Sequence, residues 1–218
     1  MQGRKITIVS FDLDGTLVDH AFVDSVWFEE IPKLIAEKER ISFKEALRKA
    51  KKEYDAIGEE RIEWYDVNYW INKFGLNKDW REILEGAKHK IQLYPEVLPV
   101  LERLSQKFKL IVNSNCPREF LELELEGTGI SNFFVKVFSS TSDFNQVRKD
   151  ESYYVKVCSL LQVDPEQMVH VGDNWKFDFE VPSRVGIKAL FLDRSGKKLG
   201  KRVIHDLTQL EGRLEGNL

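Results

Sequence analysis

The sequence has few of the features that mark disulfide-rich, exported or membrane proteins. Its 218 residues include only two cysteines, Cys116 and Cys158, which are far apart and do not have the spacing of a metal or redox pair. A disulfide scaffold is therefore not expected, and both cysteines are predicted to be small buried apolar residues. The N-terminal apolar run of about six residues is too short for a signal peptide or a membrane-spanning helix. We therefore expect a cytoplasmic protein that does not bind membranes.

The sequence also lacks an excess of basic residues. Lysine and arginine number 33 against 36 aspartates and glutamates, which gives a net charge of -3. This balance offers no electrostatic argument for binding nucleic acid or an anionic surface. Internal repeats and low-complexity tracts are absent as well. The length predicts one large core, or a core with a smaller inserted domain, and leaves the oligomeric state open.

The apolar stretch of residues 6–11 ends in Asp12-Leu13-Asp14-Gly15-Thr16. If it is a buried strand, Asp12 and Asp14 emerge on one face while Leu13 points the other way. Two carboxylates this close repel each other unless a divalent cation or a lysine neutralises them, and Mg2+ suits such a site. The alternative is a strand that merely runs into an Asx-type turn, where Asp and Gly are common.

Residues 19–92 change to a helical pattern. Ser42 and Glu45 form a capping box before an amphipathic segment, Pro32 is expected to kink or split an earlier helix, and Gly75 closes a later one. The segment is rich in tryptophan, and its rings are predicted to form its core rather than to stack on a ligand. The tryptophans are Trp27, Trp64, Trp70 and Trp80, and the predicted helices span residues 21–40, 42–57, 63–74 and 78–90.

From residue 93 onward, strands alternate with helices. This alternation predicts an α/β fold with a Rossmann-like parallel sheet and helices on both faces. The first two strands are separated by far more residues than a crossover needs. We therefore predict a core domain of residues 1–18 and 93–218 and an inserted helical cap domain of residues 19–92, mounted as a lid over Asp12 and Asp14. The predicted later strands are 108–113, 133–138, 168–171 and 186–192, and the helices are 96–106, 117–126, 150–161 and 207–214. In the helix of residues 150–161, Val155, Cys158 and Leu161 are predicted to face inward.

Polar residues follow each of the first four predicted strands. In an open parallel sheet, ligands bind outside the carboxyl ends of the strands, so these residues are expected to meet. They offer carboxylates, a hydroxyl, amides and a cation, which is the combination that a phosphoryl group requires in its transition state. Besides Asp12 and Asp14 they are Asn113-Ser114-Asn115, Arg148-Lys149, Gly172-Asp173-Asn174 and Asp178.

From residue 6 to about residue 192 the chain resembles the haloacid dehalogenase superfamily. Asp12-Leu-Asp-Gly-Thr16 matches the first motif of that family, and the apolar strand ending at Ser114 matches the second. Lys149 matches the third motif, and Gly172-Asp173 with Asp178 matches the fourth. The helical insertion resembles the family's C1-type cap. The resemblance implies a Mg2+-dependent hydrolase, a phosphatase acting on a small phosphorylated metabolite.

The same resemblance implies a role for each matching residue. Asp12 would attack phosphorus and form an aspartyl-phosphate, and Asp14 would protonate the leaving oxygen and then activate water. Ser114, Asn115 and Lys149 would bind the phosphoryl oxygens. Mg2+ would be held by Asp12, the backbone carbonyl of Asp14, Asp173 and Asp178, with Asp178 acting through water or orienting Lys149.

Several alternatives stay open at this point. Arg148-Lys149-Asp150 replaces the Lys-Pro that the family often has, so Arg148 competes with Lys149 for the third motif; we favour Lys149 because a compact ammonium shields a carboxylate without a fixed fork geometry. A phosphomutase shares every motif. A 2-haloacid dehalogenase is disfavoured because, as the resemblance implies, dehalogenases lack the group that Asp14 supplies. A catalytically idle binding protein is the remaining alternative.

Two histidines receive separate predictions. His170 lies inside an apolar strand and is predicted to be a satisfied core residue, whereas His20, just past the first motif, is a weaker candidate for touching substrate. The basic run Lys197-Lys198 and Lys201-Arg202 is predicted to be a solvated loop.

Overall fold

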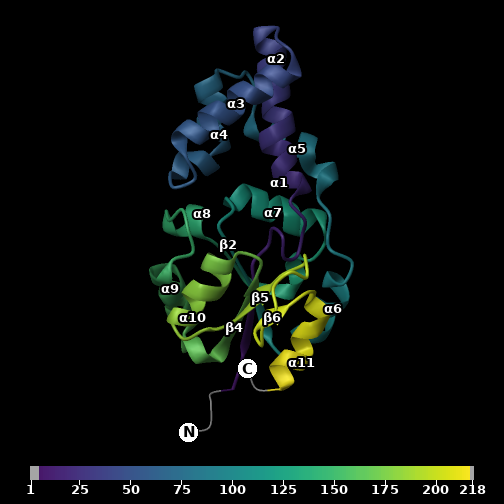
Figure 1. Ribbon diagram of the computed structural model, residues 1–218, viewed down its shortest axis with the longest axis vertical. Helices are drawn as coiled ribbons and strands as arrows, with labels where there is room; N and C mark the ends of the chain where they lie inside the picture. Colours follow the sequence, from purple (N-terminus) through teal and green to yellow (C-terminus); the bar gives the residue numbers. More distant parts are fainter. Residues whose placement is uncertain (1–4, 217–218) are drawn as a thin grey trace.

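A computed structural model describes residues 5–216, and its centre is a six-stranded parallel sheet (Figure 1). The strand order is β3-β2-β1-β4-β5-β6, and all the pairings between neighbours are parallel. The strands are β1 (Ile8–Phe11), β2 (Lys109–Ser114), β3 (Phe134–Ser139), β4 (Met168–Gly172), β5 (Lys188–Leu192) and β6 (Val203–Ile204). The predicted parallel sheet is confirmed. The sequence missed β6, because a strand of two residues carries no alternation to detect.

The strand order reverses at β1. From β1 the chain builds outward through β2 and β3, and it then returns to place β4 on the other side of β1. Open α/β sheets bind ligands in the crevice that this reversal creates at the carboxyl ends of the strands. The end of β1 is therefore the expected place for a site.

Helices cover both faces of the sheet, as predicted. Val9 and Phe11 of β1 belong to a core cluster with residues of α6, α7 and α11, whereas Ile8 belongs to a second cluster with residues of α9 and α10. Side chains that alternate along one strand thus enter different cores. The helices outside the insertion are α6 (Val97–Ser105), α7 (Arg118–Gly127), α8 (Ser140–Phe144), α9 (Glu151–Leu161), α10 (Val181–Arg184) and α11 (Leu210–Glu215).

One prediction for α9 was wrong. Val155 was expected to face inward with Cys158 and Leu161, but its side chain is 54% exposed. The buried stripe of α9 instead runs through Tyr153, Tyr154, Val157 and Cys158. The two tyrosines displace Val155 because residues 153, 154, 157 and 158 share one side of a helix and residue 155 lies on the other.

Residues 19–92 are helical throughout most of their length, and α1 to α5 lie above the sheet in Figure 1. The buried tryptophans of this segment, Trp27 and Trp70, belong to its apolar core. The split into a core domain and a cap domain stays a prediction, and residues 1–4 and 217–218 of the predicted core lie outside the described residues. The elements are α1 (Ala21–Ser25), the π-helix η1 (Val26–Glu30), α2 (Ile31–Glu39), α3 (Phe43–Ile57), α4 (Val67–Phe74), α5 (Trp80–Ala87), and the 3-10 helices η2 (Ile62–Tyr65) and η3 (Lys88–Lys90).

Local sequence explains the irregularities of this segment. Pro32 does not separate α1 from α2; instead the preceding turn, η1, widens to a π-helix. Proline has no N–H to donate and crowds the preceding turn, and a widened turn accommodates both effects. The predicted capping box of Ser42 and Glu45 begins α3. Gly75 ends α4 at a φ of 59°.

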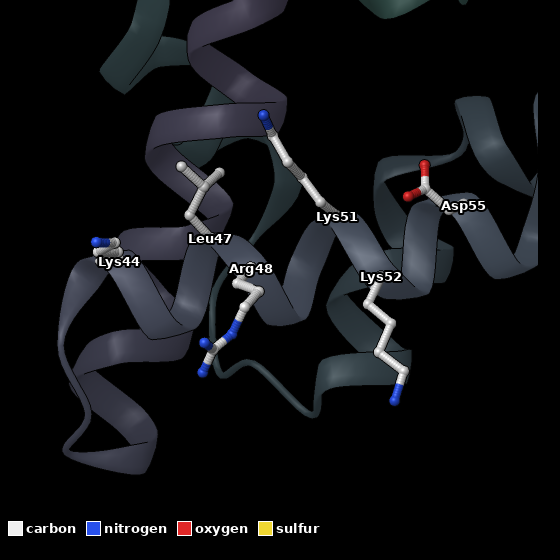
Figure 2. Close-up of a pocket in the computed structure, with 6 residues that line it drawn as sticks. All are labelled: Lys44, Leu47, Arg48, Lys51, Lys52 and Asp55. Carbon is white, nitrogen blue, oxygen red and sulfur yellow. The ribbon is translucent and has the colours of Figure 1, made fainter.

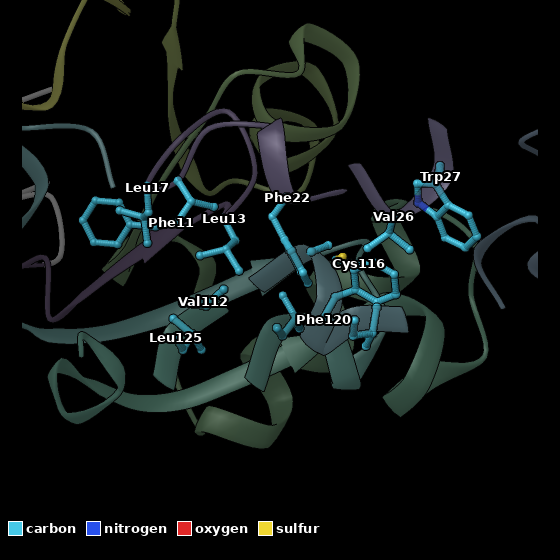
Figure 3. Packing of buried hydrophobic residues seen from close by; sticks show 14 of the residues in the cluster. Phe11, Leu13, Leu17, Phe22, Val26, Trp27, Val112, Cys116, Phe120 and Leu125 are labelled. Carbon is cyan, nitrogen blue, oxygen red and sulfur yellow. The ribbon is translucent and has the colours of Figure 1, made fainter. Parts of the chain in front are cut away.

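Apolar packing joins the helical segment to the sheet. Figure 3 shows Leu13 and Leu17 of the loop after β1 in one cluster with Phe22 and Phe120. The Phe22 and Phe120 rings lie 5.6 Å apart, so α1 rests directly on α7. This contact holds the helical segment over the carboxyl ends of the strands. None of the helices in residues 5–216 is long and apolar enough to span a membrane.

Candidate active site

Asp12 and Asp14 emerge together at the end of β1, as the strand geometry predicts. The Asp12 amide donates to the carbonyl of Val171 in β4 (2.9 Å), which continues the ladder one residue past the strand. Leu13 points into the apolar core and is fully buried. Both carboxylates line the same cavity, of about 270 Å3.

The residues to which the family resemblance assigns a role all line that cavity, whereas the competing Arg148 does not. The cavity lies between the helical segment and the carboxyl ends of β1, β2 and β4, as the strand reversal led us to expect. Aromatic and apolar residues of the helical segment and α7 form its other wall. The lining consists of Asp12, Asp14, His20, Val23, Trp27, Trp64, Tyr65, Ser114, Asn115, Cys116, Pro117, Phe120, Lys149, Asp173, Asn174 and Asp178.

Lys149 lies at the bottom of the cavity between two carboxylates. Its side chain is 1% exposed, and its Nζ atom lies 2.5 Å from Asp12 Oδ1 and 2.6 Å from Asp178 Oδ1. It also donates to the carbonyl of Asn113 (3.0 Å). Burial disfavours the ammonium, but the two carboxylates outweigh it and raise the pKa of Lys149, so the side chain stays charged.

Arg148 points elsewhere. Its guanidinium lies 2.9 Å from Glu60 and 3.5 Å from Glu59, both in the helical segment after α3. The cation that contacts Asp12 is therefore Lys149. Arg148 instead links the loop before α9 to the helical segment.

Asp178 is buried and held from three sides. It lies on the π-helix η6 (Trp175–Glu180), accepts from the Asn174 amide (2.9 Å), and lies 3.1 Å from Nε2 of His170. His170 in turn contacts Ser10 through Nδ1 (2.7 Å), so it is the satisfied core histidine that its sequence context predicted. Burial opposes ionisation of Asp178, but Lys149 and His170 lower its pKa below the ordinary range, so it is a carboxylate.

Three carboxylates are suitably placed for a metal ion. Ligand atoms of Asp12, Asp173 and Asp178 lie within 4.8 Å of one another. Burial raises the pKa of Asp12, and the charges of Asp178 and Asp173 raise it further, against the opposing charge of Lys149. One ammonium cannot balance three carboxylates, and a hard divalent cation with oxygen ligands would relieve the excess charge. The donor set therefore fits Mg2+.

The Asp14 carboxylate lies outside this cluster. It lies with Cys116 and Glu124, whose ligand atoms are within 4.8 Å of its own. Glu124, on α7, is fully buried, and burial together with Asp14 raises its pKa well above the ordinary range. Glu124 was not among the predicted site residues, because in the sequence it resembles neighbouring glutamates that are exposed. Its spacing four residues after Phe120, on the apolar side of α7, was the available signal.

Ser114 and Asn115 complete the polar side of the cavity. The Ser114 hydroxyl accepts from the Cys116 amide (3.0 Å). The Asn115 side-chain carbonyl accepts from the Lys149 amide (3.0 Å) and from the Ser140 hydroxyl (3.2 Å), so this loop positions Lys149.

Burial raises the pKa of the Cys116 thiol well above its ordinary value, as expected for an unreactive buried cysteine.

His20, the residue before α1, also lines the cavity. Its Nε2 atom lies 3.7 Å from Asp173. The contact with Asp173 raises the pKa of His20 to about 9, although partial burial acts in the opposite direction.

Of the four tryptophans in the helical segment, Trp27 and Trp64 reach the cavity, whereas Trp70 is buried away from it.

Two surface features lie away from these groups. A larger pocket, of about 460 Å3, lies on α3 among four basic side chains and includes none of the predicted site residues (Figure 2).

The basic loop after β5 is exposed, as predicted. In addition, Lys198 lies over the ring of Trp175 (3.7 Å), and Arg202 lies over the ring of Phe179 (4.7 Å). The basic loop thus covers aromatic surface of η6.

The chain is similar to known proteins across most of its length. Residues 6–186 match the model of the haloacid dehalogenase-like hydrolase family. The GMP/IMP nucleotidase YrfG of Escherichia coli is 25% identical over 173 residues, covering 78% of this chain and 76% of the nucleotidase. A phosphoglycolate phosphatase of Aquifex aeolicus is 27% identical over 196 residues, covering 83% and 82%.

A solved structure agrees with these matches. The crystal structure of a HAD phosphatase from Thermococcus onnurineus has a TM-score of 0.84 with 27% identity, covering 97% of this chain and 99% of that one. The family match spans well over half of the chain, and it includes the strands that bring the carboxylates together. The chain therefore belongs to the haloacid dehalogenase-like hydrolase family, as an enzyme of the phosphatase type.

Proposed function

We propose that the enzyme is a Mg2+-dependent phosphatase that hydrolyses a small-molecule phosphomonoester through an aspartyl-phosphate. The observation that carries the proposal is the contact of Asp12 with Lys149 beside Asp173 and Asp178. A carboxylate attacks phosphorus only in its ionised form, and the Lys149 ammonium favours that form of Asp12 against burial while contacting only one of its oxygens. This arrangement suits a nucleophile better than a purely structural ion pair.

In the first half of the reaction, an oxygen of Asp12 bonds to phosphorus while the ester oxygen leaves. Asp14, which borders the same cavity, donates a proton to that leaving oxygen, so the alcohol departs neutral. In the second half, Asp14 takes a proton from water, the water oxygen bonds to phosphorus, and the bond to Asp12 breaks to release phosphate. Splitting one displacement into two lowers each barrier.

Other residues hold the phosphoryl oxygens. Ser114 and Asn115 supply hydroxyl and amide donors at the end of β2, and Lys149 supplies a positive charge. Mg2+, held by Asp12, the Asp14 backbone carbonyl, Asp173 and Asp178, would neutralise charge on the phosphoryl group. Positioned donors and charge are the main means by which proteins accelerate phosphoryl transfer.

We further propose that residues 19–92 act as a cap that closes over the site and selects the substrate. The helical segment supplies Val23, Trp27, Trp64 and Tyr65 to the cavity wall, opposite the carboxylates. Closing such a wall excludes bulk water from the reacting atoms. A small phosphorylated metabolite fits a cavity of about 270 Å3.

Phosphate release tests the proposal. The purified enzyme would be incubated with phosphorylated sugars, nucleotides, short acids and p-nitrophenyl phosphate, with Mg2+ and with a chelator. Release that requires the metal is the expected result. Transfer of phosphate between sugar positions without release would identify a mutase instead, and no reaction in a folded, Mg2+-supplemented sample would contradict the proposal.

A further inference from the structure

Three polar side chains lie on adjacent strands inside an otherwise apolar core. Ser10 of β1, Asn113 of β2 and His170 of β4 are fully buried. They lie on the face of the sheet that α9 and α10 cover, because the residues two positions before them belong to that core: Ile8, Ile111 and Met168. Burying polar groups is costly unless they are hydrogen-bonded, so their partners explain why they are there.

These side chains form a hydrogen-bonded chain that leads from α9 to Asp178. The Tyr153 hydroxyl contacts Asn113 Oδ1 (2.7 Å), and Asn113 Nδ2 contacts Ser10 Oγ (2.6 Å). Ser10 Oγ contacts His170 Nδ1 (2.7 Å), and His170 Nε2 lies 3.1 Å from Asp178 Oδ1. All five side chains are fully buried, so bulk water does not compete for these contacts.

The chain has one direction that pairs every hydroxyl hydrogen. Tyr153 donates to Asn113 Oδ1, which turns the Asn113 amide N–H towards Ser10. The Ser10 hydroxyl accepts that N–H and therefore donates its own hydrogen to His170 Nδ1. The His170 ring is then neutral, with its hydrogen on Nε2, and donates to Asp178. The reverse direction leaves the Tyr153 hydrogen without an acceptor in residues 5–216.

The chain ends on the carboxylate that holds Lys149. Oδ1 of Asp178 accepts from His170 and lies 2.6 Å from Lys149 Nζ, while Oδ2 accepts from the Asn174 amide (2.9 Å). Lys149 also donates to the backbone carbonyl of Asn113, whose side chain belongs to the chain. The ammonium that contacts Asp12 is thus fixed through buried hydrogen bonds from two sides.

We propose that His170 is a positioning residue that, held in its Nε2–H form, keeps Asp178 and Lys149 in place beside the proposed nucleophile. The chain from Tyr153 selects this form of the ring. The inference rests on the phosphatase function proposed above and adds to it a buried residue that lies outside the cavity lining. A residue that served packing alone would have no effect on turnover by the folded enzyme.

Variants of His170 test the link to turnover, with p-nitrophenyl phosphate as the substrate. His170→Leu removes the donor to Asp178 and is expected to lower kcat about tenfold or more. His170→Gln keeps an N–H close to the position of Nε2–H and is expected to restore much of that loss. Thermal unfolding midpoints show that each variant is folded. Wild-type kcat in folded His170→Leu would overturn the inference.

Two neighbouring tyrosines provide a matched pair. Tyr153 and Tyr154 are both fully buried on α9, and the Tyr154 hydroxyl donates to the carbonyl of Phe177 (2.8 Å), outside the chain. Phenylalanine at either position keeps the ring and removes one buried hydroxyl, so similar falls in the unfolding midpoint are expected. Only Tyr153→Phe is expected to lower kcat, about fivefold, the equivalent of one hydrogen bond. Equal kcat in the two variants would contradict the proposed role of the chain.

NMR of protein labelled with 15N in histidine reads the form of the ring without turnover. The His170 signals are those lost in His170→Gln, and they are expected to show a neutral ring with its hydrogen on Nε2 in the wild type and in Tyr154→Phe. Tyr153→Phe is expected to change them. A hydrogen on Nδ1 in the wild type would overturn the inference and leave the phosphatase proposal standing. Absence of phosphate release by the wild type would instead overturn the phosphatase proposal and the link to turnover, while the ring form would stand.

Discussion

The Nζ atom of Lys149 lies 2.6 Å from Oδ1 of Asp178, and both side chains are almost completely buried. Oδ1 of Asp12 lies 2.5 Å from the same Nζ atom, so the ammonium is held between Asp178 and the proposed nucleophile. A buried charge persists only when it is paired in this way. The pairing turns a buried lysine into a fixed positive charge for the site.

Removing that charge is expected to be severe. Lys149→Met leaves Asp12 and Asp178 buried without a cation, which should cost about 3–5 kcal/mol of stability and abolish turnover. Arg148→Gln removes an ion pair with Glu60, whose side chain is 83% exposed, and should cost under about 1 kcal/mol. Urea unfolding and kcat for both variants provide the measurement. Equal loss of turnover in Arg148→Gln would move the cation role to Arg148.

Asp12→Asn is expected to lower kcat about a thousandfold or more while the protein stays folded, because an amide does not attack phosphorus and Lys149 keeps its contact with Asp178. Steady-state kinetics and the thermal unfolding midpoint check this. Asp55→Asn, on the exposed surface of α3, is the control and should keep wild-type turnover. A variant at position 12 with near-normal kcat would exclude Asp12 as the nucleophile.

Two glycines with the same backbone conformation offer a matched comparison. Gly15 and Gly129 have φ values of +74° and +73°, so alanine is strained at both and should cost about 1–2 kcal/mol. Only at position 15 does the new Cβ meet another group, lying 2.3 Å from Asp173 Oδ2. Because we propose Asp173 as a metal ligand, displacing it should raise the Mg2+ concentration for half-maximal activity about tenfold or more in Gly15→Ala. Activity titrated with Mg2+ measures the effect, and an equal shift in Gly129→Ala would contradict the steric explanation.

Arg194 ties together the two chain segments that lead into and out of the helical insertion. It donates to the carbonyls of Gly15 (3.2 Å) and Thr16 (2.7 Å) and to Glu96 (2.7 Å). Arg194→Ala leaves those acceptors short of a charged donor and should cost about 2–3 kcal/mol. Urea unfolding would show it, with Arg202→Ala, an exposed arginine, as the control. Equal destabilisation in the two variants would indicate that Arg194 has no special role.

Much of the fold was predictable because it depends on local patterns. The apolar strands, the capping box at Ser42 and the glycine that ends α4 all follow from side-chain periodicity and backbone preference. The failures have a common cause. Val155 was placed by spacing alone and Glu124 received no prediction, whereas the burial of both depends on which neighbours compete for the same core. A two-residue strand such as β6 exists only because β5 is there to pair with it.

The sequence by itself determined which chemical groups follow the apolar strands: carboxylates, a hydroxyl, amides and a lysine. It also determined that a helical insertion follows the first strand. Parallel pairing with β1 at the reversal point brings those strand ends together, and this much follows from general sheet geometry. Only the tertiary structure decided that Lys149 rather than Arg148 contacts Asp12, that Asp14 lies beside the buried Glu124, and that Trp64 and Tyr65 form the facing wall. Side-chain direction and burial depend on packing between segments distant in sequence, which periodicity does not encode.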